Sequence, residues 1–427
     1  MIHTSTPSDF WCPVGRLFLA CALLALLATD AVAGSSGESH GDTAQIASET
    51  PEPKRFVVRG ASIIDLAKDE PVFFRGVGYS PYMPGETPLN GAPPGDDDRY
   101  SDHFGRIAEL GVNYLHVFPL LMPAGFFAEL DRTELVYGQD IWIHPNEQDI
   151  LDQGFLASTL EQIKAVIDHT YAVGRPDRLV LFSVGDELWA ASVTQTNARH
   201  PEIHDYVGKH VQVTGRTAAE VALARLIDEA IDYELRRYGQ RHLYCHTSWT
   251  HIGPVADRPD LEVEAQNVLV PDMGDLVCLN VYTYARGVTT SPPGSVTGTS
   301  YQGYLEDLLA MSLKPVLITQ IGLSTSPIAP KPWVPGWGGH EPGDVPAVFR
   351  SVWRDVGTAR GREKLAGLVF FELHDEWWKS GEYPKDSSHH EDADPEEWFG
   401  LYEIGTDRRL TPKARIPETV RDLFKRP

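Results

Sequence analysis

The chain has 427 residues, of which 60 are acidic and 37 are basic, so its formal net charge is −23. This excess of negative charge repels phosphate backbones and argues against nucleic acid as a partner. Hydrophobic residues make up 42% and charged residues 23% of the sequence, which is typical of globular proteins and excludes wholesale disorder.

The first segment has the pattern of a secretory signal peptide. Arg16 precedes an apolar run at residues 17–28, and the small residues of Ala31-Val32-Ala33 precede Gly34. A positive charge, a short apolar core and a small-x-small cleavage site are the parts of such a signal. We therefore expect residues 1–33 to be a signal peptide and the protein to be secreted or periplasmic. A membrane tether is expected only if this segment is not cleaved.

The next segment, residues 34–54, is rich in Ser, Gly, Glu, Thr and Pro without apolar periodicity, which predicts a flexible linker. We place the folded domain at residues 55–427. Its first apolar runs, residues 56–64 and 72–77, flank the turn-forming stretch Lys68-Asp69-Glu70-Pro71. This pattern predicts an N-terminal hairpin that leads into the first buried strand.

Short apolar runs alternate with amphipathic stretches along the rest of the chain. The runs that predict buried strands are residues 72–77, 112–118, 140–143, 179–184, 242–246, 276–281, 316–321 and 368–373. Apolar residues spaced by three and four predict helices at residues 102–110, 156–173, 218–238, 301–311 and 345–355. Strands alternating with helices in one continuous unit predict a single α/β domain, a (β/α)8 TIM barrel, with an open doubly wound sheet as the alternative.

The connection that follows the fourth predicted strand, residues 189–215, is long and polar. In a barrel, the strand-to-helix loops gather at one face, where active sites lie. The fourth strand ends in Asp186-Glu187, and Trp189 follows closely. A carboxylate pair at this position either caps the next helix or takes part in chemistry. An aromatic ring beside an acidic pair suits glycoside chemistry.

Two cysteines, Cys245 and Cys278, remain once the signal segment is removed. We interpret them as small buried residues on strands rather than as a disulfide framework. The sequence has no CxxC spacing and no HExxH motif, so neither pattern supports a zinc site. We predict no metal and no cofactor.

Short motifs stand at the ends of the predicted strands across nearly all of residues 56–415. In chain order they are Gly76-Val77-Gly78-Tyr79-Ser80-Pro81-Tyr82, Leu110-Gly111-Val112-Asn113, Val184-Gly185-Asp186-Glu187, Leu279-Asn280-Val281-Tyr282, Lys314-Pro315-Val316-Leu317-Ile318-Thr319-Gln320-Ile321-Gly322, Phe371-Glu372-Leu373-His374-Asp375-Glu376-Trp377-Trp378-Lys379, Phe399-Gly400-Leu401-Tyr402 and Pro412-Lys413. Their order and spacing resemble those of the retaining glycoside hydrolases of clan A. The resemblance implies a (β/α)8 barrel and an oligo- or polysaccharide partner.

The resemblance also implies catalytic roles, and the sequence departs from them at one position. Such enzymes carry an Asn-Glu pair after strand four, matched here by Asp186 and Glu187, and the Glu is the general acid/base. Their nucleophile is a Glu at the end of strand seven, matched here by Gln320. An amide cannot form the usual glycosyl ester, so the two-carboxylate retaining mechanism lacks its second carboxylate.

A second departure is consistent with the first. Clan members commonly place an Arg in the strand-two motif, where it supports the nucleophile, and the matching residue here is His116. Removing the anion while keeping its cation would leave an unpaired buried charge, so joint replacement by Gln320 and a neutral His116 is physically coherent. Tyr282 matches the strand-six Tyr that hydrogen-bonds the nucleophile in the family.

Polar and aromatic residues at the strand ends are the candidates for contacts with a sugar, and each has packing in the core as its alternative explanation. The candidate substrate-binding residues are Tyr79, His116, Trp189, His246, Trp249, Tyr282, Glu372, Asp375, Glu376, Trp377 and Trp378.

Three functional interpretations follow. In the first, the protein is a glycosidase or transglycosidase with Glu187 as general acid/base and a second carboxylate from Glu372, Asp375 or Glu376. In the second, it binds a glycan without cleaving it, and tryptophan rings form the binding platforms. In the third, a minor alternative, it is a substrate-assisted hexosaminidase in which Asp186 orients an acetamido group of the substrate while Glu187 protonates the leaving oxygen.

Overall fold

A computed structural model describes residues 55–95, 98–143, 149–249, 272–283, 299–328, 338–379 and 387–425. The chain divides into two units, Met1–Glu52 and Pro53–Pro427, and all described residues belong to the second unit. The predicted signal peptide and linker, residues 1–33 and 34–54, lie outside the described residues. Within those residues, no helix is both long enough and apolar enough to span a membrane.

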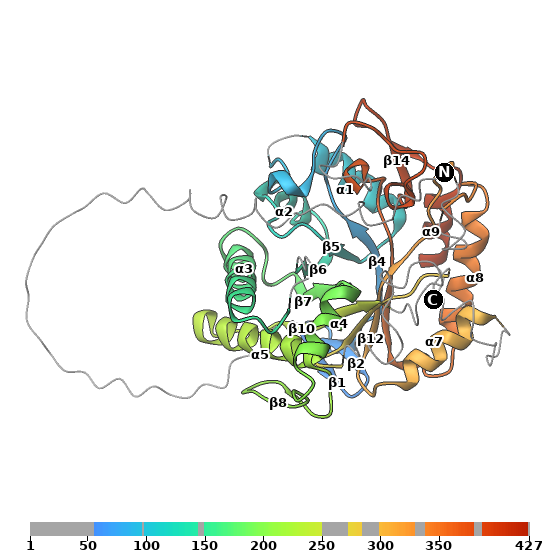
Figure 1. Cartoon of the computed structure of the whole chain (residues 1–427). Helices are drawn as coiled ribbons and strands as arrows, with labels where there is room; N and C mark the ends of the chain where they lie inside the picture. The colour runs from blue at the N-terminus through green and yellow to red at the C-terminus, as the bar shows by residue number, and fades with distance from the viewer. Residues whose placement is uncertain are drawn as a thin grey trace, which may run out of the picture. The chain divides into compact units, whose positions relative to one another are not determined.

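Eight parallel strands form a closed barrel at the centre of the domain (Figure 1). In order around the barrel they are β4 (Phe74–Tyr79), β5 (Tyr114–Val117), β6 (Val136–Ile141), β7 (Leu179–Asp186), β10 (Leu243–Trp249), β11 (Val277–Asn280), β12 (Val316–Ile321) and β13 (Leu365–Phe370). The last strand pairs with the first, with Leu368 opposite Arg75. The predicted (β/α)8 barrel is therefore confirmed, and the open-sheet alternative is wrong.

Helices surround the barrel strands (Figure 1). They are α1 (Arg99–Leu110), α2 (Ala124–Leu130), α3 (Gln153–Ala172), α4 (Ala190–Arg199), α5 (Ala218–Tyr238), α7 (Ser300–Ala310), α8 (Val345–Thr358) and α9 (Ile416–Phe424). The longest, α5, begins with a capping box in which Thr217 and Glu220 bond each other's backbone N–H groups, and it ends at the left-handed Gly239. These local signals explain why this stretch forms one uninterrupted helix.

The N-terminal hairpin is present, but its turn lies earlier than predicted. The strands β1 (Phe56–Arg59) and β2 (Ser62–Asp65) pair around Gly60, so the run at residues 56–64 is itself a hairpin. Gly60 has a φ of 62°, which a glycine adopts without steric cost. The predicted turn stretch instead leads into the short strand β3 (Glu70–Pro71), which pairs with β2.

The long connection predicted after the fourth strand is itself folded. It contains α4 and a small hairpin of β8 (Tyr206–Val207) and β9 (Gln212–Val213). Asp228 of α5 accepts backbone hydrogen bonds from Lys209, His210 and Val211, which fastens this hairpin to the helix. A second hairpin, formed by β14 (Tyr402–Ile404) and β15 (Leu410–Pro412), follows the last barrel strand. Short 3-10 helices occur at Pro88–Asn90, Arg362–Lys364, Trp377–Lys379 and Pro395–Trp398.

The inside of the barrel is a packed core. Phe56 of the hairpin packs edge-on against Phe74, at the amino end of β4, and thereby covers that end of the barrel. Cys245 and Cys278 are buried free thiols on neighbouring strands, with their sulfurs 2.8 Å apart, which confirms that they are small buried residues on strands. Since the amino end is filled, the carboxyl ends of the strands are left to form a site.

Close packing inside the barrel gives a stability prediction. A Cβ at Gly138 of β6 would collide with the hydroxyl of Tyr114 and crowd Leu181. We expect Gly138→Ala to lower the free energy of unfolding by about 1–3 kcal/mol, the usual cost of overpacking a core. Urea unfolding measures this change.

Gly105 supplies the matched control, because a Cβ there meets no atom within 4 Å on α1. Gly105→Ala should raise the free energy of unfolding by roughly 0.5–1 kcal/mol, since alanine suits a helix better than glycine. Equal stability of the two variants would contradict this view of the barrel interior.

Candidate active site at the carboxyl end of the barrel

The carboxyl end of β7 places two acidic side chains together. Gly185 and Glu187 both have left-handed backbone conformations, with φ values of 79° and 47°. Such a conformation is unfavourable for Glu187 and is typical of residues held at functional sites. The Glu187 N–H donates to the carbonyl of Thr247 on β10, which fixes the turn. Asp186 is buried and Glu187 half-buried.

Asn280, the last residue of β11, connects the two carboxyls. Its amide nitrogen donates to Oδ1 of Asp186 at 2.9 Å and to Oε1 of Glu187 at 2.7 Å. The hydroxyl of Thr319 donates to Oδ1, the side-chain amide oxygen of Asn280, at 2.8 Å. This hydrogen bond fixes the amide in the orientation that presents its nitrogen to both acids.

Gln320 on β12 approaches Asp186 from the other side. Its amide nitrogen donates to Oδ2 of Asp186 at 3.0 Å, and the Tyr282 hydroxyl donates to its carbonyl oxygen at 2.6 Å. The structure therefore brings the three predicted catalytic residues, Glu187, Asp186 and Gln320, into one hydrogen-bonded network together with Tyr282.

Asp140 on β6 also belongs to this cluster and was not predicted as a site residue. Its side chain is buried and its Oδ1 has no hydrogen-bond partner among the described residues. The strand begins at Val136, earlier than predicted, and alternation from Val136 through Gly138 points Asp140 into the barrel. That alternation is the sequence signal that identifies Asp140.

Burial and mutual repulsion raise the pKa values of the acids in this cluster. Burial, and then the charge of Asp186, raises the pKa of Glu187 to about 8, against a smaller lowering by the Asn280 hydrogen bond. Burial and the neighbouring Asp140 raise the pKa of Asp186 above its ordinary value. The pKa of Asp140 is also raised, mainly by burial. Lys379 lowers the pKa of both Asp186 and Glu187 by its positive charge.

Two predicted site histidines are fully buried and uncharged. His116 on β5 is fully buried, its Nδ1 lies 3.0 Å from the Tyr114 hydroxyl, and burial lowers its pKa to about 3. His246 on β10 contacts the carbonyl of Val184 through Nδ1 at 2.9 Å, and burial lowers its pKa to about 4. Both lie within the barrel wall and contribute no positive charge to the site.

The acids that follow β13 are held by cations. Lys413 lies 2.5 Å from Oδ1 of Asp375, which also accepts the Gly400 N–H. Lys379 lies 2.9 Å from Oε2 of Glu376 and 4.0 Å from Oε1 of Glu372. All three acids are buried. Asp375 and Glu376 therefore belong to buried ion pairs. Glu372 differs, because neither of its oxygens has a hydrogen-bond partner among the described residues and burial, followed by the charge of Glu376, raises its pKa.

Two of the aromatic residues predicted to contact a sugar, Tyr79 and Trp377, are buried. Tyr79 is fully buried, with its ring stacked on Phe126 and its hydroxyl 3.1 Å from Nδ1 of His103, so the structure places it in the core and not at the substrate face. Trp377 is buried and stacks on His390.

Other tryptophans remain partly accessible. Trp378 is half-buried, packs edge-on to Tyr82 and donates to Glu376. Trp189, which precedes α4, is also half-buried. Trp142 directly follows β6, is 37% exposed, and was not predicted as a site residue. Since Ile141 pairs with Val184, Trp142 emerges beside the end of β7. The side chain of Trp249 lies outside the described residues.

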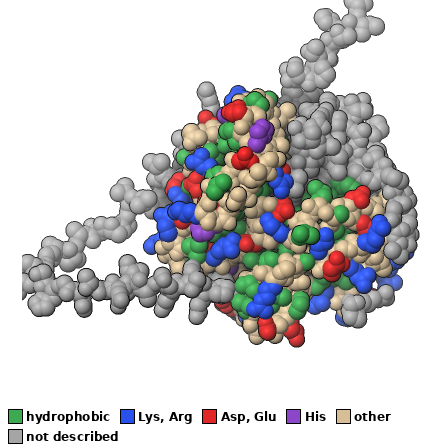
Figure 2. Space-filling model, turned by 90° about the horizontal axis from the view of Figure 1, so that it is seen from below, with side chains coloured by type: hydrophobic (Ala, Val, Ile, Leu, Met, Phe, Trp, Pro, Cys, Tyr) green, Lys and Arg blue, Asp and Glu red, His purple; other side chains and the backbone are tan. Residues whose placement is uncertain are grey.

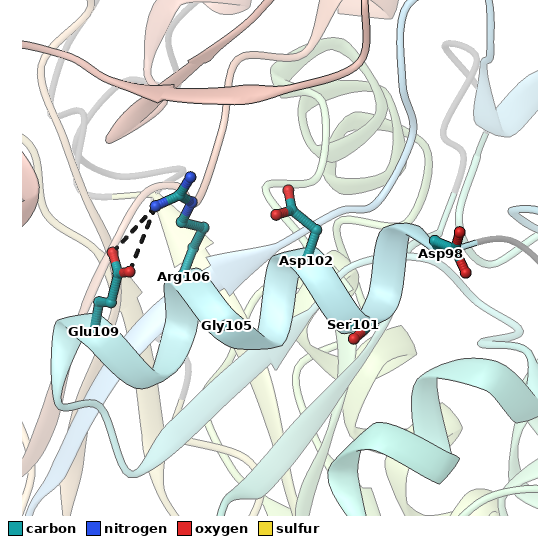
Figure 3. A pocket seen from close by; sticks show the side chains of 6 residues that line it. All are labelled: Asp98, Ser101, Asp102, Gly105, Arg106 and Glu109. Carbon is teal, nitrogen blue, oxygen red and sulfur yellow. Dashed lines mark hydrogen bonds and ion pairs between the residues drawn. The ribbon is translucent and has the colours of Figure 1, made fainter.

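One surface pocket lies elsewhere. It is lined by Asp98, Ser101, Asp102, Gly105, Arg106 and Glu109, all on or next to α1 (Figure 3). It shares no residue with the network at the strand ends. On the face in Figure 2, basic and acidic side chains are interspersed. Within the described part of the chain, no group of three or more His, Cys, Asp or Glu side chains is arranged to hold a metal ion.

Solved structures of other proteins share this fold. No family model and no curated protein matches the sequence. A GH2 beta-galacturonidase from Eisenbergiella tayi bound to galacturonate matches with a TM-score of 0.53 and 14% identity, over 87% of this chain and 54% of that one. A Saccharomyces cerevisiae Gas2p mutant in complex with laminaritetraose and laminaripentaose matches with a TM-score of 0.52 and 13% identity, over 88% and 69%.

A third structure, the beta-glucuronidase of Ruminococcus gnavus, matches with a TM-score of 0.53 and 12% identity, over 87% of this chain and 53% of that one. The chain thus spans about half the length of the galacturonidase and glucuronidase. These neighbours are carbohydrate-active barrel proteins, and at such identities the likeness shows the fold alone.

The raised pKa of Glu187 gives a prediction for stability. A carboxyl whose pKa is higher in the folded state than its ordinary value of 4.5 favours folding below that value, and this contribution is lost as pH rises towards about 8. The Glu187→Gln variant has no carboxyl at this position that can ionise. Its thermal midpoint should therefore increase relative to wild type as pH rises from 4.5 to about 8 and then stay at a constant difference.

Glu403→Gln is the control, because that side chain is exposed on β14. Thermal unfolding followed by circular dichroism across this pH range measures both variants. A difference between Glu187→Gln and wild type that does not change with pH would contradict a protonated Glu187.

Proposed function

We propose that the protein is a secreted carbohydrate-active enzyme, a glycoside hydrolase or transglycosidase that acts on an oligo- or polysaccharide. The observation that carries this proposal is Glu187, a half-buried carboxyl at the end of β7 whose pKa of about 8 keeps it protonated at neutral pH. A protonated carboxyl is what a glycosidic oxygen needs from a general acid. The signal pattern of residues 1–33 is the basis for secretion or a periplasmic location.

The network around Glu187 assigns its proton to one oxygen. Oε1 accepts a hydrogen bond from Asn280, so the proton is placed on Oε2. In the reaction, Oε2 gives this proton to the leaving oxygen as the glycosidic bond breaks. The resulting carboxylate keeps its hydrogen bond to Asn280 and is ready to take a proton from the acceptor, which is water in hydrolysis and a sugar hydroxyl in transfer.

The neighbouring structures support a carbohydrate substrate. One is named as a galacturonidase with galacturonate bound and another contains laminari-oligosaccharides. Gln320 marks the difference from a standard retaining site, because its amide cannot form a glycosyl ester. The proposal therefore assigns the general acid to Glu187 and treats the nucleophile as non-standard.

A second candidate function is glycan binding without cleavage. It is favoured by Gln320 at the family's nucleophile position and by the ion pairs that hold Asp375 and Glu376. In that case Trp142 and Trp378, at the carboxyl end of the barrel, would supply the aromatic contacts.

The acid role predicts a leaving-group effect. Glu187→Gln should lower kcat/KM by about 10²–10⁴-fold on an oligosaccharide, whose leaving sugar needs a proton, and by less on an aryl glycoside with an acidic leaving group. Wild-type kcat/KM should fall as pH rises through about 8, because the acid form is lost.

Initial rates on both substrate types across this pH range measure the effect, with Glu403→Gln as the control. Turnover of the oligosaccharide by Glu187→Gln at the wild-type rate would overturn the assignment.

Binding can be separated from cleavage with tryptophan variants. On a glycan array, Glu187→Gln should bind the same glycans as wild type, and a Trp142→Ala, Trp378→Ala double variant should bind them roughly tenfold or more weakly, because each ring stacks on a sugar face. Leu313→Ala is the control, since Leu313 is 88% exposed before β12, at the amino end of the barrel. Unchanged binding by the double variant would exclude these rings as platforms.

A further inference from the structure

A carboxyl and an amide face each other across one hydrogen bond at the centre of the site. The acid is Asp186 on β7 and the amide is Gln320 on β12, with 3.0 Å between Nε2 and Oδ2. In the family that the sequence resembles, an amide precedes the general acid and a carboxyl ends strand seven. The two groups have therefore exchanged places, and the number of carboxyls at this point is unchanged.

Hydroxyl groups fix the direction of the amides on both sides of Asp186. The Tyr282 hydroxyl donates to the carbonyl oxygen of Gln320, and the Thr319 hydroxyl donates to that of Asn280. In the reverse orientation, a carbonyl oxygen would face a carboxylate oxygen. With the amides held in this way, each oxygen of Asp186 accepts one N–H, Oδ1 from Asn280 and Oδ2 from Gln320.

This arrangement favours a negative charge on Asp186. Hydrogen bonds donated to both oxygens stabilise the ionised form of a carboxyl, whereas burial opposes it. Its neighbour Asp140 has an oxygen with no hydrogen-bond partner among the described residues. Of these two acids, Asp140 is therefore the better holder of a proton, which leaves Asp186 as the anion.

The spacing between Asp186 and Glu187 limits what the pair can do. Oδ1 of Asp186 and Oε1 of Glu187 lie 2.9 and 2.7 Å from the same nitrogen of Asn280. Two oxygens that share one nitrogen cannot be separated by the roughly 6.5–9.5 Å that an inverting pair uses to admit water. An anion this close to the acid instead suits direct stabilisation of the sugar cation.

We propose that Asp186 is the second catalytic carboxylate of this site, the anion that stabilises the positive charge developing on the sugar ring while Glu187 protonates the leaving oxygen. Gln320 and Asn280 are its positioning residues. This inference rests on the proposed function and replaces Glu372, Asp375 and Glu376 as candidates for the second carboxylate.

The exchange predicts how paired variants behave. Gln320→Glu alone sets a second carboxyl against Asp186, and two carboxyls at this distance cannot both ionise, so this variant should gain no activity. Asp186→Asn alone removes the anion. Combining the two substitutions restores one carboxyl and one amide across the same hydrogen bond, in the opposite direction.

The experiment compares wild type, Asp186→Asn, Gln320→Glu and the double variant on an oligosaccharide and an aryl glycoside. Asp186→Asn should lower kcat by about 10²-fold or more on both substrates. Loss of the general acid, in contrast, should lower the rate on the oligosaccharide more than the rate on the aryl glycoside. The double variant should exceed both single variants by roughly tenfold or more. Asp407→Asn, an exposed acid between β14 and β15, is the control, and thermal unfolding verifies that each variant is folded.

The outcomes separate this inference from the function on which it rests. If wild type turns over glycosides and Glu187→Gln loses that activity, but Asp186→Asn retains it, the role of Asp186 is overturned and the proposed function stands. A folded double variant no more active than either single variant also overturns that role. If Asp186→Asn fails to fold, the activity of the double variant is compared with that of Gln320→Glu alone. A double variant that is no more active than Gln320→Glu then overturns the role of Asp186. A wild type that cleaves no glycoside overturns the function together with the inference.

Discussion

The hydrogen bonds that hold the buried Asp186 carboxyl are the interaction on which the site depends. The acid ends β7, whereas its two amide partners end β11 and belong to β12, so the network forms only when the barrel has brought these distant strands together. The hydroxyls of Thr319 and Tyr282 then fix both amides. The site is therefore assembled by the pairing of β7 with β10, of β10 with β11 and of β11 with β12.

The same network explains how an acidic site is tolerated. Asp140, Asp186 and Glu187 are close enough to raise one another's pKa values, and no cation forms an ion pair with them among the described residues. Lys379 acts on Asp186 and Glu187 through its charge, while its ammonium pairs with Glu376. A proton on Glu187 reduces the repulsion, and this proton is the one that a glycosidic oxygen can use. Burying these acids lowers the stability of the fold, and the same burial keeps the proton on Glu187 that the proposed reaction uses.

Local pattern was enough to predict the barrel and the acidic pair Asp186-Glu187, because strands that alternate with helices and a motif at a strand end are local in sequence. Gln320 was identified through the resemblance to clan A glycoside hydrolases. Local pattern was not enough to predict ion pairs and burial that depend on residues far apart in the sequence. Lys413, which neutralises Asp375, lies far along the chain, and Tyr79 is buried by α1 and α2. Asp140 was missed because the predicted strand began at that residue, which hid the inward alternation from Val136.

The proposed acid role requires that the Glu187 carboxyl, at the end of β7, stays protonated at neutral pH. Infrared difference spectroscopy of the carboxyl stretch during a pH titration tests it most directly, with Glu187→Gln as the reference. We expect a protonated-carboxyl band that disappears with a midpoint of about 8 in wild type and is missing in the variant. A wild-type spectrum in which every carboxyl has ionised well below neutral pH would contradict it.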